Sequence, residues 1–186
     1  MNKFPAIVVI IGSVMFLIAA FMPISFVYAE RDVQTQIARV QGSPLAWVIS
    51  LSLFALGSIL VAAGLAWVTL YLRSTSVAFA SSIGLVMIAF GTLCWVVIVY
   101  QRATLPLQDV FGAPTFGWLF IAYTVLTQAA LIAYGFTFLR TGYPRWLGLS
   151  AIIPAMLLCA AYLIFKDVPP FAYYVITLAI GIGLVF

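Results

Sequence analysis

The sequence predicts an all-α integral membrane protein, a polytopic bundle of six transmembrane helices that forms a single domain over residues 1–186. Of its 186 residues, 66% are hydrophobic and only 6% are charged, whereas soluble domains carry about 25% charged residues. A membrane-spanning helix needs about 20 mainly apolar residues. Six uncharged runs approach or exceed that length, and we expect each to span the membrane: 4–29, 44–72, 77–101, 113–139, 147–165 and 168–186.

The first run, 4–29, has an alternative interpretation. Its basic start at Lys3 and its ending at Ala29 also resemble a secretory signal with a cleavage site after Ala29. The apolar run is about twice as long as the core of a typical signal peptide. We therefore interpret it as a retained first span.

The second and third runs carry small residues at intervals of seven, Ser50, Gly57 and Gly64 in one and Gly84 and Gly91 in the other. Seven residues make about two helical turns, so each set lies on one helix face. Small residues allow helices to approach closely within lipid. Because only the four residues RSTS join the two runs, we expect a tight antiparallel hairpin.

The loops after the first and third runs are the longest and mix polar with apolar residues. In the first loop, Val33, Ile37 and Val40 are spaced to share one face of a short helix lying in the membrane interface. One interpretation is a lid of two interfacial segments over the helix ends. The other is a docking surface for a partner protein or an amphiphile, with Arg39 and Arg102 contacting an anionic head group.

The fourth run contains the most polar intramembrane side chain, Gln128, close to Thr124 and Tyr123. An amide within hydrocarbon requires a hydrogen-bond partner, so we expect Gln128 to bond across to another helix. The alternative is that Gln128, Thr124 and Tyr123 contact a ligand.

The turn between the fourth and fifth runs reads RTGYPRWLG, from Arg140 to Gly148. Gly142 permits a left-handed residue that ends the fourth helix, and Pro144 cannot continue that helix. Arg140 faces the negative end of the helix dipole. We therefore expect a structural turn without a catalytic role.

The same turn carries a resemblance to a known family. A Leu–Arg pair that ends one span, followed by YPRWLG at 143–148, resembles the penultimate hairpin of uncharacterised bacterial six-helix membrane proteins grouped as domain of unknown function 4386. The resemblance implies a six-helix bundle in the bacterial inner membrane. It implies no activity, because the family has none to transfer.

Basic residues do not fix the orientation by number, since each side of the predicted bundle carries four. The side with both termini has Lys3, Arg73, Arg140 and Arg145, and the other has Arg31, Arg39, Arg102 and Lys166 together with all four acids. Bases are denser in the tight turns of the first side, so the positive-inside rule predicts cytoplasmic termini. The alternative is a full inversion.

The sequence contains no histidine and only two cysteines, so it lacks the commonest metal ligand and general base and the thiols of a zinc site. No predicted span contains an ionisable acid or base. We expect a non-enzymatic protein with no catalytic residue, cofactor, metal or nucleic-acid partner. Cys94 and Cys159 have similar predicted depths and either pair or remain free apolar packers.

These observations lead to two hypotheses about function. The first is an accessory or scaffold subunit of a membrane complex, whose partners are the bilayer and other membrane proteins. The second is a small carrier or binder of a neutral or amphiphilic molecule, in a cavity under the outer loops. A cavity near Gln128 favours the second hypothesis, and a continuous helix face without a cavity favours the first.

Overall fold

The computed structural model describes residues 3–73, 75–112, 117–165 and 168–186, and all regular structure in these segments is helical. The all-α class is therefore confirmed. The elements are α1 (Phe4–Phe21), the 3-10 helix η1 (Pro23–Ala29), α2 (Val33–Gly42), α3 (Pro44–Leu72), α4 (Ala78–Thr104), α5 (Leu107–Gly112), α6 (Gly117–Leu139), α7 (Arg145–Phe165) and α8 (Phe171–Val185).

Within the described segments, five helices are long and apolar enough to cross a membrane: α1, α3, α4, α6 and α7. The chain is thus an integral membrane protein by the length and composition of its helices. Helix α8 is apolar but has 15 residues, which reach about 22 Å, short of the roughly 30 Å of a hydrocarbon core. A sixth span therefore remains a prediction.

The first helix is shorter than the predicted span of 4–29, and Pro23 explains the difference. Helix α1 ends at Phe21, and Met22 has extended backbone angles. Proline has no N–H to donate to the carbonyl four residues earlier, and its ring clashes with that group. That carbonyl, on Ala19, instead accepts the Ser25 hydroxyl at 2.6 Å and the Met22 N–H at 3.3 Å. The chain then continues as η1.

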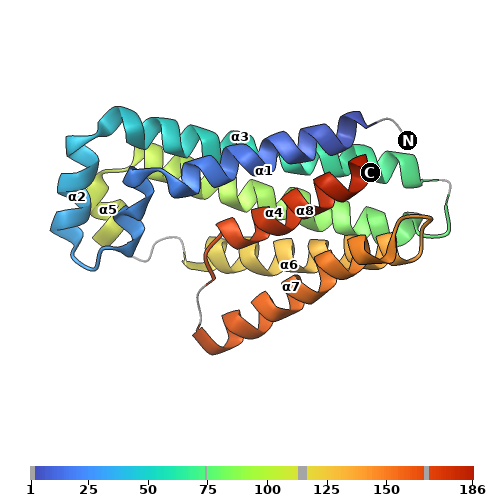
Figure 1. Ribbon diagram of the computed structural model, residues 1–186. Helices are drawn as coiled ribbons and strands as arrows, with labels where there is room; N and C mark the ends of the chain where they lie inside the picture. Colours follow the sequence, from blue (N-terminus) through green and yellow to red (C-terminus); the bar gives the residue numbers. More distant parts are fainter. Residues whose placement is uncertain (1–2, 74, 113–116, 166–167) are drawn as a thin grey trace.

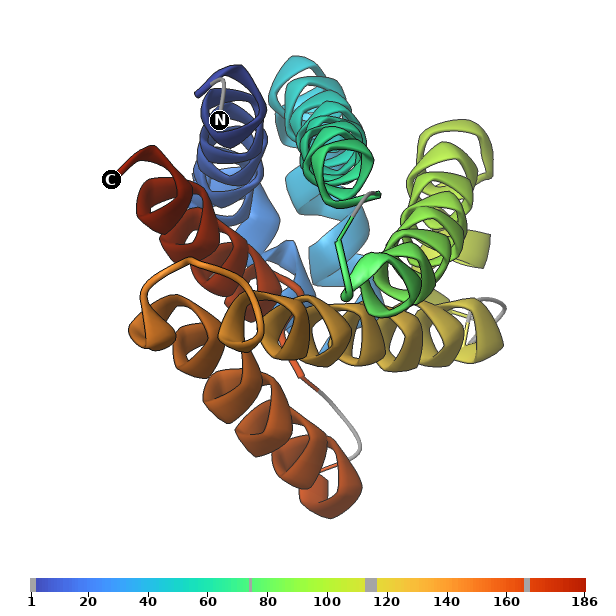
Figure 2. The same cartoon turned by 90° about the vertical axis from the view of Figure 1, so that its right-hand side faces the viewer.

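The helices form a ring of neighbours (Figures 1 and 2). Helix α1 packs on α3 and α8, α4 packs on α3 and α6, and α7 packs on α6 and α8. The start of α1 and the end of α8 lie at one end of the bundle, together with the end of α3 and the turn after α6, and we name it the terminal end. The opposite end carries η1, α2 and α5 and is named the loop end.

The small-residue faces mediate close contacts, but not with each other. Helices α3 and α4 do pack together as a hairpin. However, a Cβ added to Gly57 would lie 2.7 Å from the carbonyl oxygen of Gly12 on α1, and Gly64 also faces α1. Gly84 and Gly91 face α6 instead. Helix α1 also has a glycine at this contact, because Gly12 faces Gly57 of α3. The two helix backbones therefore approach each other closely at this point.

The turn after α6 has the structural character expected of it, with one correction. Helix α6 ends at Leu139 and α7 begins at Arg145. The Pro144 carbonyl accepts the Leu147 N–H at 3.0 Å, which starts α7. Gly142 does not adopt a left-handed conformation, and a Cβ added to it would meet no atom of another residue within 4 Å, its two chain neighbours apart. The termination of α6 therefore does not depend on the freedom of glycine.

Candidate functional site

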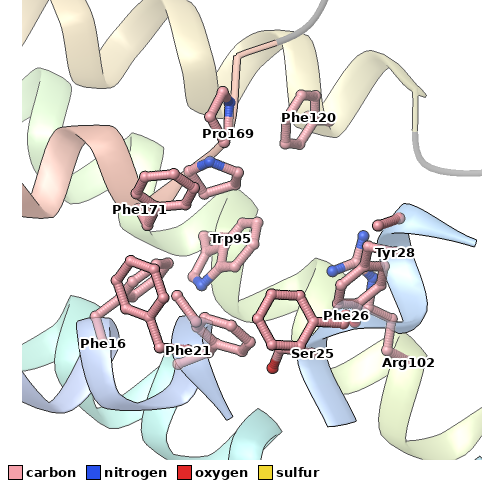
Figure 3. Close-up of a pocket in the computed structure, with 14 residues that line it drawn as sticks. Phe16, Phe21, Ser25, Phe26, Tyr28, Trp95, Arg102, Phe120, Pro169 and Phe171 are labelled. Carbon is pink, nitrogen blue, oxygen red and sulfur yellow. The ribbon is translucent and has the colours of Figure 1, made fainter. Parts of the chain in front are cut away.

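A cavity of about 420 Å³ lies at the loop end, between α1, η1, α3, α4, α6 and the segment that enters α8. Its walls are mostly aromatic rings and prolines (Figure 3). The side chains that line it include Phe16, Phe21, Phe26, Tyr28, Phe54, Trp95, Phe120, Pro169, Pro170 and Phe171. The polar groups on these residues are the Ser25 hydroxyl, the Tyr28 phenol, the Trp95 indole N–H and the Arg102 guanidinium.

The inner wall of the cavity belongs to an aromatic cluster to which five helices contribute. Phe16 stacks on Tyr174 with ring centroids 3.5 Å apart and contacts Phe54 at 4.7 Å. Trp95 lies 4.8 Å from Tyr123. Aromatic pairs contribute about 0.5–1.5 kcal/mol each beyond their buried area. The cluster therefore holds α1, α3, α4, α6 and α8 together at the depth of the cavity.

Ser25 lines the cavity, but its hydroxyl is hydrogen-bonded within the protein. Its hydroxyl donates to the Ala19 carbonyl and also bonds to the Ser50 hydroxyl at 2.9 Å. Ser25 therefore fixes η1 against α3 and offers little to a ligand.

Arg102 lies in the last turn of α4 and brings a positive charge to the cavity. Its guanidinium carbon is 4.5 Å from the centre of the Tyr28 ring and 5.8 Å from that of Trp95. Such cation–π contacts are favourable, but they do not cancel the charge. The ion pair found among the described residues joins Arg39 to Glu30. No described carboxylate lies within 4.0 Å of the Arg102 guanidinium.

The phenol of Tyr28 does not neutralise Arg102 either. Desolvation by the surrounding side chains raises the pKa of Tyr28 above its ordinary value of 10.0, and the nearby Arg102 charge opposes that rise only in part. Tyr28 is therefore neutral at physiological pH. The cavity keeps a net positive charge at this wall.

Helices α2 and α5 pack against each other at the loop end, and α2 also packs on η1; neither contributes a side chain to the cavity wall. Ile37 and Val40 are buried, as predicted for one face of a short helix, and Val33 is half-buried. The Gln36 amide donates to the Glu30 carbonyl at 2.9 Å, which ties α2 to the end of η1. From α5, Phe111 contacts the Tyr28 and Trp47 rings.

Helix α2 begins at an N-cap that the sequence analysis did not single out. The Asp32 carboxylate accepts hydrogen bonds from the Thr35 hydroxyl and the Thr35 N–H, both at 2.7 Å. These bonds favour the charged form and lower the pKa of Asp32.

Arg39 does not join Arg102 at the cavity. Its guanidinium bonds to the Glu30 carboxylate at 2.7 Å, and 41% of its side chain is exposed. Of the two arginines expected to contact an anionic head group, the structure brings only Arg102 to a cavity.

Gln128 bonds across to two other helices, so this expectation is confirmed. Its amide nitrogen donates to the Tyr173 hydroxyl at 3.1 Å, and its oxygen accepts from the Cys159 thiol at 2.8 Å. Tyr123 and Thr124 are buried on the same helix. None of these α6 residues lines the cavity. Cys94 and Cys159 are both free thiols.

Sequence reasoning did not identify the aromatic wall, although one signal was present. Trp95 lies deep within its run, whereas the other four tryptophans lie near predicted span ends. A tryptophan away from the interface is unusual. Phe16 and Phe54 gave no signal, since phenylalanine is ordinary in membrane helices.

No family model, curated protein or solved structure matches this chain. The resemblance carried by residues 143–148 therefore remains a prediction. Within the part of the chain that the structure describes, no group of three His, Cys, Asp or Glu residues is arranged to hold a metal ion.

Proposed function

We propose that this protein binds an anionic amphiphile in the cavity at the loop end, with the apolar part among the aromatic rings and the anionic group at Arg102. The observation that carries the proposal is an aromatic cavity with one unneutralised guanidinium at its wall. This proposal takes up the second hypothesis from the sequence, a binder of an amphiphilic molecule. It places the ligand in the cavity at the loop end instead of beside Gln128.

Cavity size and lining both support the proposal. Ligand cavities commonly measure about 300–1,000 Å³ and combine apolar walls with a few placed polar groups, and this one measures about 420 Å³. A neutral ligand would leave the Arg102 charge without a counterion. An anionic group would form a charge-assisted hydrogen bond, which contributes about 1.5–3 kcal/mol.

The ligand would have a second donor available in the same wall. The indole N–H of Trp95 is buried and has no hydrogen-bond acceptor within the described segments. The centre of the Trp95 ring lies 5.8 Å from the Arg102 guanidinium carbon. Together, the two donors suit a carboxylate or a phosphate.

A photoactivatable long-chain fatty acid tests the proposal on the full-length protein in lipid nanodiscs. After irradiation, mass spectrometry should locate the label on peptides that line the cavity, such as those containing Phe21 or Phe171. The Arg102→Gln variant should need at least about 10-fold more probe for equal labelling, which corresponds to 1.4 kcal/mol.

The matched control is Arg39→Gln, which removes the same charge from the same end of the bundle outside the cavity. Its labelling should equal that of the wild type. The methyl ester of the probe should label wild type and Arg102→Gln equally, because it carries no anion. Equal loss in both arginine variants, or labelling spread evenly over lipid-facing peptides, would refute the proposal.

We propose as a second candidate the accessory or scaffold subunit expected from the sequence. The observation that favours it is the position of α7, which is the least buried of the five long helices and lies at the edge of the bundle in Figure 2. An apolar helix so placed can pack on another membrane protein as well as on lipid. This role and amphiphile binding are compatible.

Purification from native membranes in mild detergent, followed by mass spectrometry, separates the two candidates. Stoichiometric partner proteins would support the accessory role. A lone protein with a bound amphiphile would argue against it. We further propose a bacterial inner-membrane location with both termini in the cytoplasm, which cysteine labelling at either end of the bundle in intact cells would test.

A further inference from the structure

A second hollow lies on the outer surface of the bundle, in the groove between α4 and α6, which pack side by side (Figure 1). The groove measures about 630 Å³. Its apolar walls include Phe79 and Ile83 on α4 and Ala129 and Phe136 on α6. Phe79 and Phe136 are 79% and 54% exposed. In a membrane, such a surface meets acyl chains.

Toward the terminal end, the groove finishes at Arg140, which also lines a more polar hollow formed by the turns after α3 and α6. Thr75 and Thr141 contribute hydroxyls to this hollow. A guanidinium thus lies where an apolar groove meets a polar one. A phospholipid has the same order of parts: an acyl chain, then a phosphate.

Charge favours an anionic occupant at this end. Arg140 has no carboxylate within 4.0 Å among the described residues. Three other bases flank helix ends on this side: Lys3 precedes α1, Arg73 follows α3 and Arg145 begins α7. The described acids belong to the elements of the loop end: Glu30 follows η1, Asp32 caps α2 and Asp109 lies in α5. Basic residues near a membrane surface attract anionic lipids.

We propose that the α4–α6 groove binds one anionic phospholipid, with an acyl chain along the groove and the phosphate at Arg140. This site lies at the opposite end of the bundle from the amphiphile cavity. It uses other residues and does not rest on the proposed function.

Native mass spectrometry of the full-length protein with equimolar phosphatidylglycerol and phosphatidylcholine tests the proposal. The wild type should retain one phosphatidylglycerol in preference to phosphatidylcholine. Arg140→Gln should lower the retained phosphatidylglycerol at least fivefold, as expected for the loss of one base at a lipid head group. Arg145→Gln removes an equal charge at the same end outside both hollows and should retain the lipid.

A second variant tests the groove without changing charge. Ala129→Phe fills the apolar wall and should also reduce the retained phosphatidylglycerol, with the helical circular dichroism unchanged. Equal losses in Arg140→Gln and Arg145→Gln would show general electrostatic attraction and overturn the site. Equal retention of the two lipids by the wild type would overturn it too. So would full retention of phosphatidylglycerol by Ala129→Phe.

Discussion

Replacing Gly57 with alanine should destabilise the bundle by separating α1 from α3. The new Cβ would lie 2.7 Å from the Gly12 carbonyl oxygen and 2.9 Å from the Phe16 backbone nitrogen, whereas ordinary contacts begin near 3.4 Å. Both opposing atoms belong to the backbone of α1, so no side-chain rotation relieves the contact. The two helices must therefore move apart.

The magnitude follows from two opposing effects. Overpacking of this kind costs about 1–3 kcal/mol, while alanine gains up to about 1 kcal/mol over glycine in helix propensity. Because the clash is with backbone, we expect the first effect to dominate. The free energy of unfolding should fall by about 1–2 kcal/mol, measured by SDS titration in mixed micelles with circular dichroism.

The matched control is Gly42→Ala at the end of α2. No atom lies within 4 Å of a Cβ added there, so its stability should match the wild type within about 0.5 kcal/mol. Because Phe16 lines the cavity, Gly57→Ala should also weaken probe labelling, and Gly42→Ala should not. Equal stability of the Gly57 variant and the control would refute the close approach of α1 and α3.

Three other predictions test the interior and helix α2. Gln128→Leu should lower the free energy of unfolding by about 1 kcal/mol in the same titration, because it removes hydrogen bonds to α7 and α8; unchanged stability would contradict those bonds. Without reductant, Cys94 and Cys159 should each take up one maleimide after denaturation, by intact mass, and an unlabelled mass would indicate a disulfide. The folded-state pKa of Asp32 is below its ordinary value of 3.8, so its cap stabilises α2 above that pH and weakens as the pH falls further. Amide protection in α2, measured by hydrogen exchange, should therefore fall below about pH 3.8, and it should fall less in Asp32→Asn, in which the Arg39–Glu30 ion pair remains; equal pH dependence in both proteins would count against the cap.

The long helices were predictable because lipid offers no hydrogen-bond partners to the backbone. Every peptide group within hydrocarbon must bond internally, so a long uncharged run becomes a helix. The predicted run 44–72 coincides with α3. In the first run the α-helix ends before Pro23, which hydropathy ignores but which removes a donor from the helix. The difference between the run and the helix therefore arises from one missing N–H.

Partners of helix faces were less predictable than the faces themselves. Small residues spaced by seven correctly indicated where helices approach closely. They did not indicate which helix approaches, since Gly57 meets α1 and Gly84 meets α6 although α3 and α4 are adjacent in sequence. Likewise, the cavity depends on Phe16, Phe54 and Trp95, which three different helices supply. No local sequence pattern predicts that side chains from three separate helices line one cavity.

Arg39 and Arg102 show why the candidate site needed the structure. In the sequence both are loop-end arginines beside apolar residues, and both were expected to contact an anionic head. Arg39 forms an exposed ion pair with Glu30, and the Glu30 carboxylate neutralises its charge. Arg102 instead lies over the Tyr28 ring, where a π face attracts a cation while leaving its charge intact. An aromatic partner therefore holds Arg102 in place and keeps it able to bind an anion, which a carboxylate partner would prevent.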